Sequence, residues 1–248
     1  MTEHDSHPTS SDQDAAPETA QWIIPDASRM EALAEFAAGA GHEINNPLAT
    51  IIGRAQQLLK DEPNPQRRQM LQSIGAQAYR VRDMIGDTML FGRPPTPELQ
   101  RVCLAEVAAK VVTQLGEQLE QSNCKVVIAV PPTVALNADP VQLAVVLSEL
   151  LRNSRHALQP SGGAIELSAT ETADGFVQIE IMDRGAGFSE LERIHAFDPF
   201  FSGRQAGRGL GFGLSKCWQI LRQHGGRIEI ESVTGGSTTV RSFWPISR

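Results

Sequence analysis

The most constraining feature of this sequence is a pair of long runs in which an apolar residue recurs every three or four positions. The first run begins near Ser28 and continues to about Lys60, and the second extends from Pro65 to Phe91. This spacing places the apolar side chains on one side of a helix. The runs therefore predict two long helices joined by a short turn, an antiparallel hairpin. The apolar positions are Leu33, Ala37, Ala40, Ile44, Leu48, Ile51, Ala55 and Leu58, then Met70, Ile74, Ala78, Val81, Ile85 and Met89.

The ends of these helices carry their own signals. Ser28 followed by Glu31 has the spacing of a capping box, so we expect the first helix to begin there. Pro65 suits the first turn of the second helix. Two helices with one apolar stripe each cannot enclose a core alone, so pairing two copies into a four-helix bundle buries both stripes. We therefore expect a homodimer.

Beyond the hairpin the pattern changes. Residues 92–97 hold three prolines and predict a linker. Later segments alternate between helical and strand periods, which predicts an α+β sandwich with helices on one face of a mixed sheet. Helices are expected at 104–121, at 140–158 after an Asp139 cap, and from Gly213 to a Gly225 stop. Strands are expected at 125–130, 133–137, 164–170, 176–183, 227–231 and 238–244. The predicted divisions are a disordered acidic tail (1–27), the hairpin (28–91), a linker (92–98) and the α+β domain (99–248).

Charge and composition exclude several classes of protein. Six of the 29 acidic residues precede Arg29, and the remainder, 23 acids against 22 Lys and Arg, is close to neutral. Such a surface gives no basis for nucleic-acid binding. No apolar run is long enough to span a bilayer and the N-terminus lacks a signal-peptide pattern, so we expect no membrane partner and a cytoplasmic location. Cys103, Cys124 and Cys217 lack the spacing of a disulfide framework or a zinc site.

One candidate for chemistry lies on the first helix. His42 falls almost opposite the apolar position Ile44, and Asn46 shares its face. Pro47 removes the amide that would bond the carbonyl of Glu43, which favours a local kink. Taken alone, the pattern is equally that of a surface histidine beside an incidental proline.

The α+β domain carries three further candidates. Asp183-Arg-Gly-Ala-Gly-Phe188 follows a strand directly and fits either a ligand-contacting turn or an ordinary one. Gly207-Arg-Gly-Leu-Gly-Phe-Gly213 opens a helix, whose amides favour phosphate, although a flexible glycine loop is also possible. Glu149, Asn153 and His156 share the polar border of a helix, where an Asn oxygen suits Mg²⁺. Between them, Phe197-Asp-Pro-Phe-Phe-Ser-Gly-Arg204 is an aromatic segment in a polar loop.

The order of these motifs resembles that of the sensor histidine kinases of two-component signalling. Gly41-His-Glu-Ile-Asn-Asn-Pro-Leu48 is similar to the phosphoacceptor box, most of all to the nitrogen-regulation type, and residues 149–153 are similar to the N box. The two glycine motifs and the aromatic segment resemble the family's first glycine, second glycine and aromatic boxes. The resemblance covers residues 29–248 and implies a Bergerat-type ATP-binding domain after the phosphoacceptor hairpin.

The resemblance implies a role for each matching residue. His42 would accept the γ-phosphoryl group of ATP, Glu43 would orient its ring or take its proton, and Asn46 would position water for dephosphorylating a partner. Asn153 would ligate Mg²⁺, and Asp183 would bond the adenine amino group. Gly185 and Gly187 would let the backbone approach the base, and amides near Gly209 and Gly211 would hold phosphates. The remaining nucleotide-site residues implied by the boxes are Glu149, His156, Arg204, Gly207 and Gly213.

Three positions depart from the family pattern. Ser154 stands where Ala is usual, His156 where Lys or Arg often reaches the phosphates, and Arg204 where Lys is usual, although its fork is not equivalent to an ammonium. The resemblance predicts an ATP- and Mg²⁺-dependent kinase that passes phosphate from His42 to an aspartate of a separate response regulator receiver domain in trans. The alternatives are a kinase-inactive nucleotide-binding scaffold or phosphatase for a regulator, and an ATPase in which Glu149 activates water. The input signal, the regulator and the choice between cis and trans autophosphorylation are not readable from the sequence.

Overall fold

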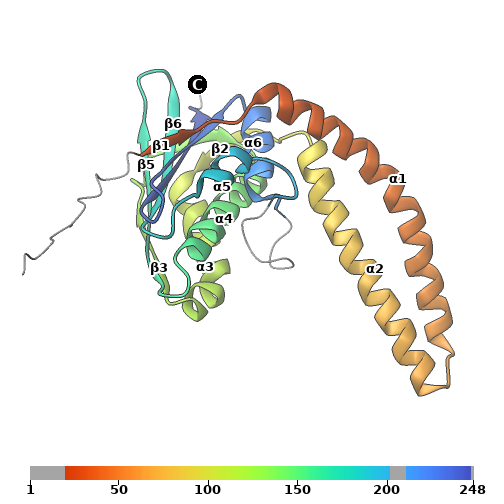
Figure 1. The fold of residues 1–248 in the computed structure, drawn as a ribbon. Coiled ribbons are helices and arrows are strands. Elements are labelled where there is room, and N and C mark those ends of the chain that lie inside the picture. The colour runs from red at the N-terminus through yellow and green to blue at the C-terminus, as the bar shows by residue number, and fades with distance from the viewer. Residues whose placement is uncertain (1–19, 202–210, 247–248) are drawn as a thin grey trace, which may run out of the picture.

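The structure is a computed structural model that describes residues 20–201 and 211–246 of the chain. A helical hairpin projects from a mixed α/β domain (Figure 1). The predicted tail up to residue 19, and the site candidates Arg204, Gly207 and Gly209, lie outside the described residues. Within the described part, none of the helices combines the length and apolar composition that a bilayer crossing requires.

The predicted antiparallel hairpin is confirmed. It consists of α1 (Ala27–Lys60) and α2 (Pro65–Gly92). The predicted Ser28 cap is wrong by two residues, because the side chain of Asp26 accepts the hydrogen bond from the Arg29 amide at 3.2 Å. The second helix begins as expected at Pro65, where the Asn64 side chain accepts from the amides of Gln66 and Arg67.

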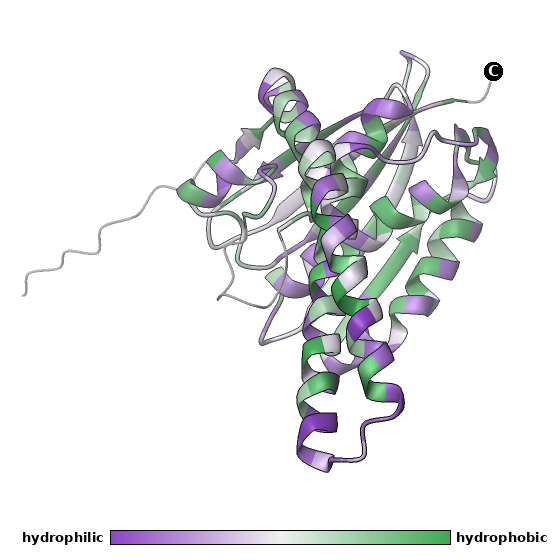
Figure 2. Ribbon diagram, turned by 90° about the vertical axis from the view of Figure 1, so that its right-hand side faces the viewer, coloured by the Kyte–Doolittle hydropathy of each residue, from purple (hydrophilic) through white to green (hydrophobic). Residues whose placement is uncertain are grey.

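The helices of the hairpin carry two apolar stripes rather than the single one expected. One stripe is buried between α1 and α2 and includes Ala37, Leu48, Ile52, Ala55 and Ala78. The other stripe is exposed in the single chain. The apolar stripe expected from the sequence therefore combined residues from two different faces of the helices. Figure 2 shows hydrophobic residues recurring along both helices. The exposed stripe consists of Ile44 (41% exposed), Ile51 (48%), Leu58 (62%), Met70 (67%), Ile74 (50%) and Val81 (39%).

The segment before α1 is not disordered throughout. Residues expected in the tail form β1 (Gln21–Ile23), which pairs antiparallel with β7 (Arg227–Ser232) and forms one edge of the sheet. Ile23 is 6% exposed, and the Arg241 guanidinium lies 5.0 Å from the centre of the Trp22 ring. The prediction failed here because a three-residue strand is stabilised by a distant partner rather than by its own pattern.

The α/β domain is built on a six-stranded mixed sheet with the order β1-β7-β8-β6-β5-β3. All pairs are antiparallel except β3 with β5, which confirms the expected mixed sheet. A separate pair, β2 with β4, was not predicted as such, and β2 itself was missed. The remaining strands are β2 (Gln100–Cys103), β3 (Cys124–Ala129), β4 (Ala135–Ala138), β5 (Gly163–Glu171), β6 (Phe176–Asp183) and β8 (Thr238–Pro245).

One row of the sheet crosses four strands. Gln21 of β1 pairs with Ser232 of β7, which pairs with Thr238 of β8, which pairs in turn with Asp183 of β6. The hydroxyl oxygens of Ser232 and Thr238 are 2.9 Å apart, and both residues are buried. The row therefore connects the edge strand β1 directly with the end of β6.

The helices cover one face of this sheet, as expected (Figure 1). They are α3 (Leu104–Gln121), α4 (Pro140–Ala157) and α6 (Gly213–Gln223), and a short unpredicted helix, α5 (Glu190–His195), follows the turn after β6. Asp139 caps α4 through the amides of Val141 and Gln142, as predicted. The apolar core lies between these helices and the sheet; its fully buried members include Leu143, Leu147, Leu150, Leu151, Ile165, Leu167 and Trp244.

The hairpin rests on the α/β domain mainly through α2 and α6. The ring centres of Phe91 on α2 and Phe212 at the start of α6 are 6.4 Å apart. One turn away on each helix, Asp87 accepts a hydrogen bond from Lys216. An exposed ion pair of 2.8 Å between Arg222 and Glu31 adds a contact with α1. These contacts bring one end of α2 beside the cavity described next.

Candidate functional site

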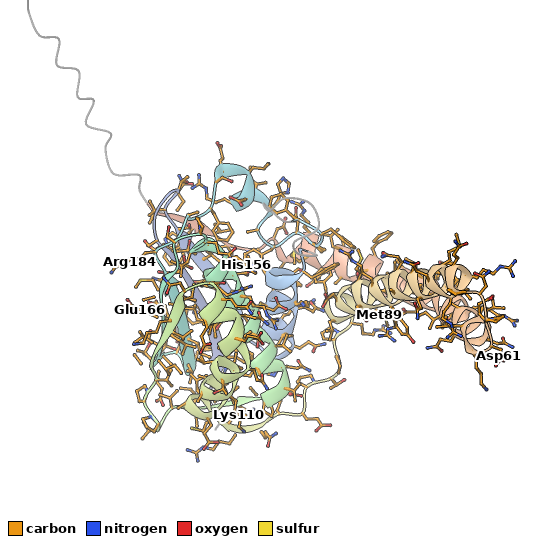
Figure 3. The ribbon with its side chains drawn as sticks, turned by 90° about the horizontal axis from the view of Figure 1, so that it is seen from below. Asp61, Met89, Lys110, His156, Glu166 and Arg184 are labelled. Atoms are coloured by element: carbon orange, nitrogen blue, oxygen red, sulfur yellow. The ribbon has the colours of Figure 1, made fainter. Side chains whose placement is uncertain are left out.

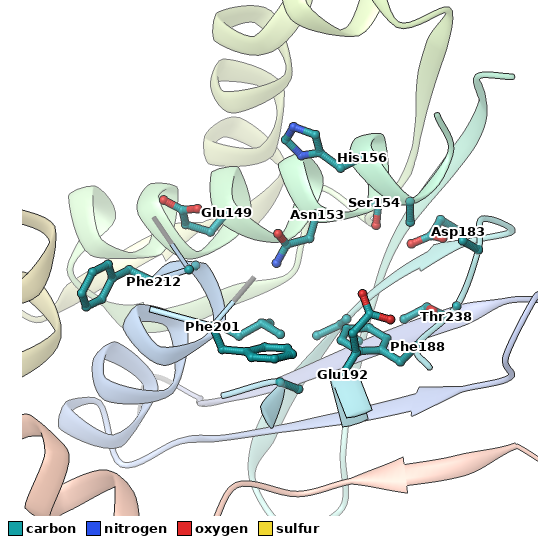
Figure 4. A pocket seen from close by; sticks show the side chains of 18 of the residues that line it. Glu149, Asn153, Ser154, His156, Asp183, Phe188, Glu192, Phe201, Phe212 and Thr238 are labelled. Carbon is teal, nitrogen blue, oxygen red and sulfur yellow. The ribbon is translucent and has the colours of Figure 1, made fainter. Parts of the chain in front are cut away.

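A cavity of about 380 Å³ lies between α4, the turn after β6, the start of α6 and one residue of α2. Figure 4 shows Glu149 and Asp183 at opposite ends of this cavity, with Asn153 between them. The volume falls in the range of small-molecule sites. The structure thus brings together seven of the predicted site residues, which are Glu149, Asn153, His156, Asp183, Gly187, Gly211 and Gly213.

Asp183 ends β6 and supplies a buried carboxylate at one end of the cavity. It is 3% exposed, and its Oδ1 accepts a hydrogen bond from the Gly185 amide at 3.0 Å. Burial raises the pKa of this carboxyl group, while hydrogen bonds from the Ser154 side chain and the Gly185 amide oppose the shift. Ser154, noted in the sequence as a departure, therefore orients the carboxylate. Such an acceptor suits a ligand that offers an N–H donor.

The glycines after Asp183 are required by contacts within the chain itself. A Cβ atom on Gly185 would lie 2.5 Å from the carbonyl of Ala157 at the end of α4. Gly187 has φ +64°, and a Cβ there would lie 1.9 Å from the carbonyl oxygen of Val233. Close packing of the turn therefore explains both glycines, and their approach to a base stays a prediction.

The polar border of α4 faces the other end of the cavity. Glu149 is one turn before Asn153, and both lie close to the start of α6. A Cβ on Gly213 would lie 3.2 Å from Glu149 Oε2 and 3.6 Å from Asn153 Nδ2, so the first turn of α6 lies directly against the polar side chains of α4.

His156 lies at the rim of the cavity rather than between Glu149 and Asp183. Its Nδ1 donates to the carbonyl of Arg152 at 2.5 Å, and its Nε2 is 3.0 Å from the Arg155 guanidinium. A neutral ring protonated on Nδ1 satisfies both contacts. This arrangement does not supply the positive charge that a basic side chain would bring to a phosphate group.

The start of α6 offers backbone donors to the cavity. Phe212 occupies the N-cap position, and within the described part of the chain no side chain caps the first turn. Gly211 has φ +71°, and a Cβ there would lie 2.4 Å from the carbonyl oxygen of Phe201. Gly211, Gly213 and Leu214 line the cavity. An uncapped helix N-terminus that opens on a cavity favours an anion.

Sequence reasoning missed a buried ion pair at this end of the cavity. Lys216 is 7% exposed, and its Nζ donates to Glu149 Oε1 at 2.8 Å and to Asp87 Oδ1 at 3.0 Å. Burial would lower the pKa of Lys216, but the two carboxylates outweigh it and hold the pKa above the ordinary lysine value. No pattern in the sequence singled out Lys216, because the helix around it mixes polar and apolar residues.

The phosphoacceptor candidates lie on α1, away from the cavity lining. Glu43 and Asn46 are exposed on this helix, and Pro47 is accommodated inside it. His42 lies in the same turn, but its side chain is outside the described part of the structure. Among the described residues, Asp87 of α2 is the hairpin residue that lines the cavity.

Comparisons with known domains match both halves of the chain. Residues 32–97 match the model of the His Kinase A (phospho-acceptor) domain, and residues 138–248 match that of the histidine kinase-, DNA gyrase B-, and HSP90-like ATPase. The chain thus carries a histidine kinase phosphoacceptor domain followed by a histidine kinase-like ATPase domain. The resemblance to two-component sensor kinases is thereby confirmed, whereas the nitrogen-regulation type of its phosphoacceptor box stays a prediction.

Curated histidine kinases match most of this chain. The sensor histidine kinase ZraS of Klebsiella oxytoca is 29% identical over 221 residues, which cover 88% of this chain and 47% of that protein. The C4-dicarboxylate transport sensor protein DctS of Rhodobacter capsulatus is 31% identical over 226 residues, covering 88% and 34% respectively. The chain thus spans half or less of the length of these relatives.

Solved histidine kinases share the fold. Full-length ShkA in complex with AMPPNP superimposes with a TM-score of 0.69 at 20% identity, covering 86% of this chain and 46% of that one. Histidine kinase ThkA in complex with the response regulator protein TrrA gives a TM-score of 0.59 at 22% identity, covering 89% and 64%. These likenesses confirm a helical hairpin followed by the family's α/β fold.

The residues of the cavity fit a nucleotide with Mg²⁺. The buried Asp183 acceptor suits an amino group, and the uncapped start of α6 suits phosphates. Among the described residues, no group of three His, Cys, Asp or Glu could hold a metal alone. A magnesium ion here would take Asn153 together with phosphate oxygens, the ligand set that Mg²⁺ favours. Its chemistry would be to neutralise charge on the phosphates.

Proposed function

We propose that this chain is an ATP-dependent protein-histidine kinase that phosphorylates its own His42 and passes the group to an aspartate of a response regulator. The observation that supports it most is the chemical difference between the two ends of the cavity. One end offers a buried carboxylate and the other an uncapped helix N-terminus beside Asn153, which matches a ligand with a base at one end and phosphates at the other.

Each cavity residue has a defined task in this proposal. Asp183 accepts a hydrogen bond from the adenine amino group, and the amides at Gly211 and Gly213 bind phosphate oxygens. Asn153 holds Mg²⁺. These interactions position the triphosphate and neutralise its charge, which is most of what phosphoryl transfer requires.

The transfer itself takes place on α1. A neutral imidazole nitrogen of His42 forms a bond to the γ-phosphorus while the bond to the ADP oxygen breaks. Glu43, the next residue, orients the ring or accepts its proton. An unperturbed histidine has a pKa of about 6.5, so most rings are neutral near pH 7. Asn46, one turn further on the same helix, positions water for the reverse task of dephosphorylating a partner.

Dimerisation explains the exposed apolar stripe of the hairpin. We assign residues 28–91 to dimerisation and phosphate acceptance, 92–98 to a linker and 99–248 to ATP binding. Ile44, Ile51 and Leu58 recur at intervals of seven residues, the spacing of a helix-bundle seam. A second copy would cover this stripe in a four-helix bundle.

The next acceptor is a separate receiver domain. The related fold of ThkA is seen in complex with a response regulator protein, which supports this class of partner. Both ATP and receiver domains are cytoplasmic, so we place the described domains there. No feature of the cavity or hairpin calls for nucleic acid or a membrane as a partner.

The structure weighs against the ATPase alternative. Glu149 would have to accept a proton from water, but its Oε1 is 2.8 Å from Lys216 Nζ and 3.7 Å from an Arg152 nitrogen. The scaffold and phosphatase alternatives differ from the kinase in one respect, the absence of label on His42.

The deciding experiment is labelling with ATP tagged on its γ-phosphate in the presence of Mg²⁺. We expect an acid-labile, alkali-stable label on the unmodified chain that is absent from His42→Gln and from Asn153→Ala. His42→Gln should still bind nucleotide, because the described residues that line the cavity lie outside α1.

Two controls separate the outcomes. Glu35→Gln removes an exposed carboxylate elsewhere on α1 and should leave labelling unchanged. Nucleotide binding without label would overturn the kinase and favour a scaffold. Steady phosphate release that depends on Glu149 but not on His42 would favour the ATPase.

A further inference from the structure

The buried ammonium of Lys216 is the one feature of the site that the proposed function leaves unexplained. It extends from α6 towards two carboxylates on different elements, Glu149 of α4 and Asp87 of α2. Lys216, Glu149 and Asp87 all line the cavity. The same cation therefore lies at the phosphate end of the nucleotide site and in the contact between the two halves of the molecule.

The contact between the hairpin and the α/β domain joins one face of α2 to one face of α6. Phe212 and Lys216 are one turn apart on α6, and they meet Phe91 and Asp87, one turn apart on α2. Phe91 is fully buried, whereas the Asp87 side chain is 32% exposed. The aromatic contact is apolar and insensitive to charge, while the ion pair beside it responds to any charge that enters the cavity.

A triphosphate entering this cavity would change the balance of charges. Asp87 and Glu149 already place two carboxylates there against the Lys216 ammonium. Polyphosphate oxygens would be repelled by Asp87 and attracted to Lys216, and these forces are strong because the groups are largely removed from water. The repulsion from Glu149 acts within the α/β domain, whereas the repulsion from Asp87 acts on the hairpin, because Asp87 is on α2.

We propose that Lys216 is a shared cation that holds α2 at the mouth of the cavity when no nucleotide is present, and that turns to the phosphates of a bound nucleoside triphosphate, releasing α2. Phe91 and Phe212 remain in contact and act as the pivot. This inference rests on the proposed nucleotide site. It assigns Lys216 both a phosphate-binding role and a positioning role.

The coupling has to act in both directions. If nucleotide releases α2, then releasing α2 by mutation strengthens nucleotide binding by the same factor. Asp87→Asn weakens the tie while preserving the shape of the side chain, and Lys216→Met removes the cation while preserving the length of the chain. Asp83→Asn is the matched control, because Asp83 is one turn before Asp87 on α2 and its side chain is 70% exposed.

The first test is a double-mutant cycle on the dissociation constant of a non-hydrolysable ATP analogue with Mg²⁺. We expect Lys216→Met to weaken binding about tenfold, the scale of a lost charge-assisted hydrogen bond. Asp87→Asn should tighten binding about fivefold in the unmodified background, a typical coupling factor. In the Lys216→Met background the same change should have less than about a twofold effect, because α2 is no longer held at the cavity.

The second test measures the position of the hairpin. Figure 3 labels Asp61 at the hairpin tip and Lys110 on α3, and both residues are exposed. A fluorescent donor is attached at one of these positions and an acceptor at the other. Labelled chain is diluted into excess unlabelled chain so that energy transfer is measured within one molecule. Saturating analogue should change the distance in the unmodified chain, and Asp87→Asn should show the changed distance before any analogue is added.

The outcomes separate this inference from the proposed function. Failure of the unmodified chain to bind the analogue would overturn both. Binding with additive effects of the two substitutions would overturn the inference alone, because Asp87 would then act by repulsion independent of Lys216. A hairpin position that neither the analogue nor Asp87→Asn changes would also overturn it. Circular dichroism and thermal unfolding of Lys216→Met establish that the variant is folded.

Discussion

The phenyl ring of Phe91, at the end of α2, lies 6.4 Å from the ring of Phe212, which caps α6 beside the nucleotide cavity. Phe91 is fully buried and Phe212 is 2% exposed. A side chain of the hairpin is thus part of the core of the α/β domain. The two halves of the molecule therefore share stability as well as a surface.

Removal of the Phe91 ring should destabilise the whole chain. Phe91→Ala leaves a cavity between α2 and α6, and such changes reduce the free energy of unfolding by about 3–5 kcal/mol. Urea unfolding followed by circular dichroism measures the change. Leu191→Ala is the control, because Leu191 is 62% exposed and its loss should change stability by less than about 0.5 kcal/mol. Equal effects of the two substitutions would contradict the shared core.

Asp183→Asn should separate nucleotide affinity from stability. The amide keeps an oxygen for the Gly185 amide but loses the charge that suits an amino group, so analogue binding should weaken by about tenfold or more. Because burial raises the pKa of the Asp183 carboxyl above the ordinary value of 3.8, its ionised form is disfavoured in the folded chain. At pH 7 the variant should therefore be at least as stable as the unmodified chain.

The pH dependence of stability gives the same prediction a second readout. Between pH 3.8 and the raised pKa of Asp183, the folded chain holds the proton more tightly than the unfolded chain. Stability therefore falls as pH rises through this window, and Asp183→Asn should remove that part of the slope. Urea midpoints of both proteins from pH 4 to 7 measure it. An identical slope in the variant would assign the dependence to other groups.

A charge on the exposed stripe should prevent dimerisation. Ile51 is 48% exposed in the single chain and is seven residues from both Ile44 and Leu58. Ile51→Glu would bury a carboxylate in the proposed four-helix bundle, a change with a penalty of several kcal/mol. Sedimentation equilibrium should show a monomer for this variant and a dimer for Gln57→Glu, which is exposed on another side of α1. A dimer in both would place the interface elsewhere.

The strand β1 offers a matched pair of adjacent isoleucines. Ile23 is 6% exposed and packs on the sheet, whereas Ile24 is 70% exposed. Ile23→Ser should lower the free energy of unfolding by about 2 kcal/mol, the value of one buried aliphatic side chain. Ile24→Ser should change it by less than about 0.5 kcal/mol. Hydrogen exchange at Ile230 and Ser232 in β7 should also rise only in the first variant.

Much of the fold was predictable because it is locally encoded. The hairpin, α3 and α4 follow from apolar spacing and from caps such as Asn64 and Asp139, which act within a few residues. β1 was missed because its stability depends on β7, about 200 residues later in the chain. The two stripes of the hairpin were merged because residues facing α2 and residues facing outwards alternate within the same spacing.

The site residues also divide into those that the sequence predicted and those that it did not. The order of motifs led to Asp183, Glu149, Asn153 and Gly213, and the structure brings these around one cavity. It did not lead to Lys216 or Asp87, since neither carries a pattern of its own. Their roles become visible only from the hydrogen bond between them, which joins residues that are 129 positions apart in the sequence. His156 shows the reverse case, in which a neighbour, Arg155, determines what the ring contacts.

The row of paired residues from Gln21 through Ser232 and Thr238 to Asp183 links β1 to the end of β6 through the two strands between them. Because hydrogen-bonded strands move together, a displacement of β1 would reach the Asp183 end of the cavity without passing through α1. Asp26 also ties the segment after β1 to the first turn of α1. A displacement at this point would therefore divide between α1, which carries His42, and the end of β6, which carries Asp183.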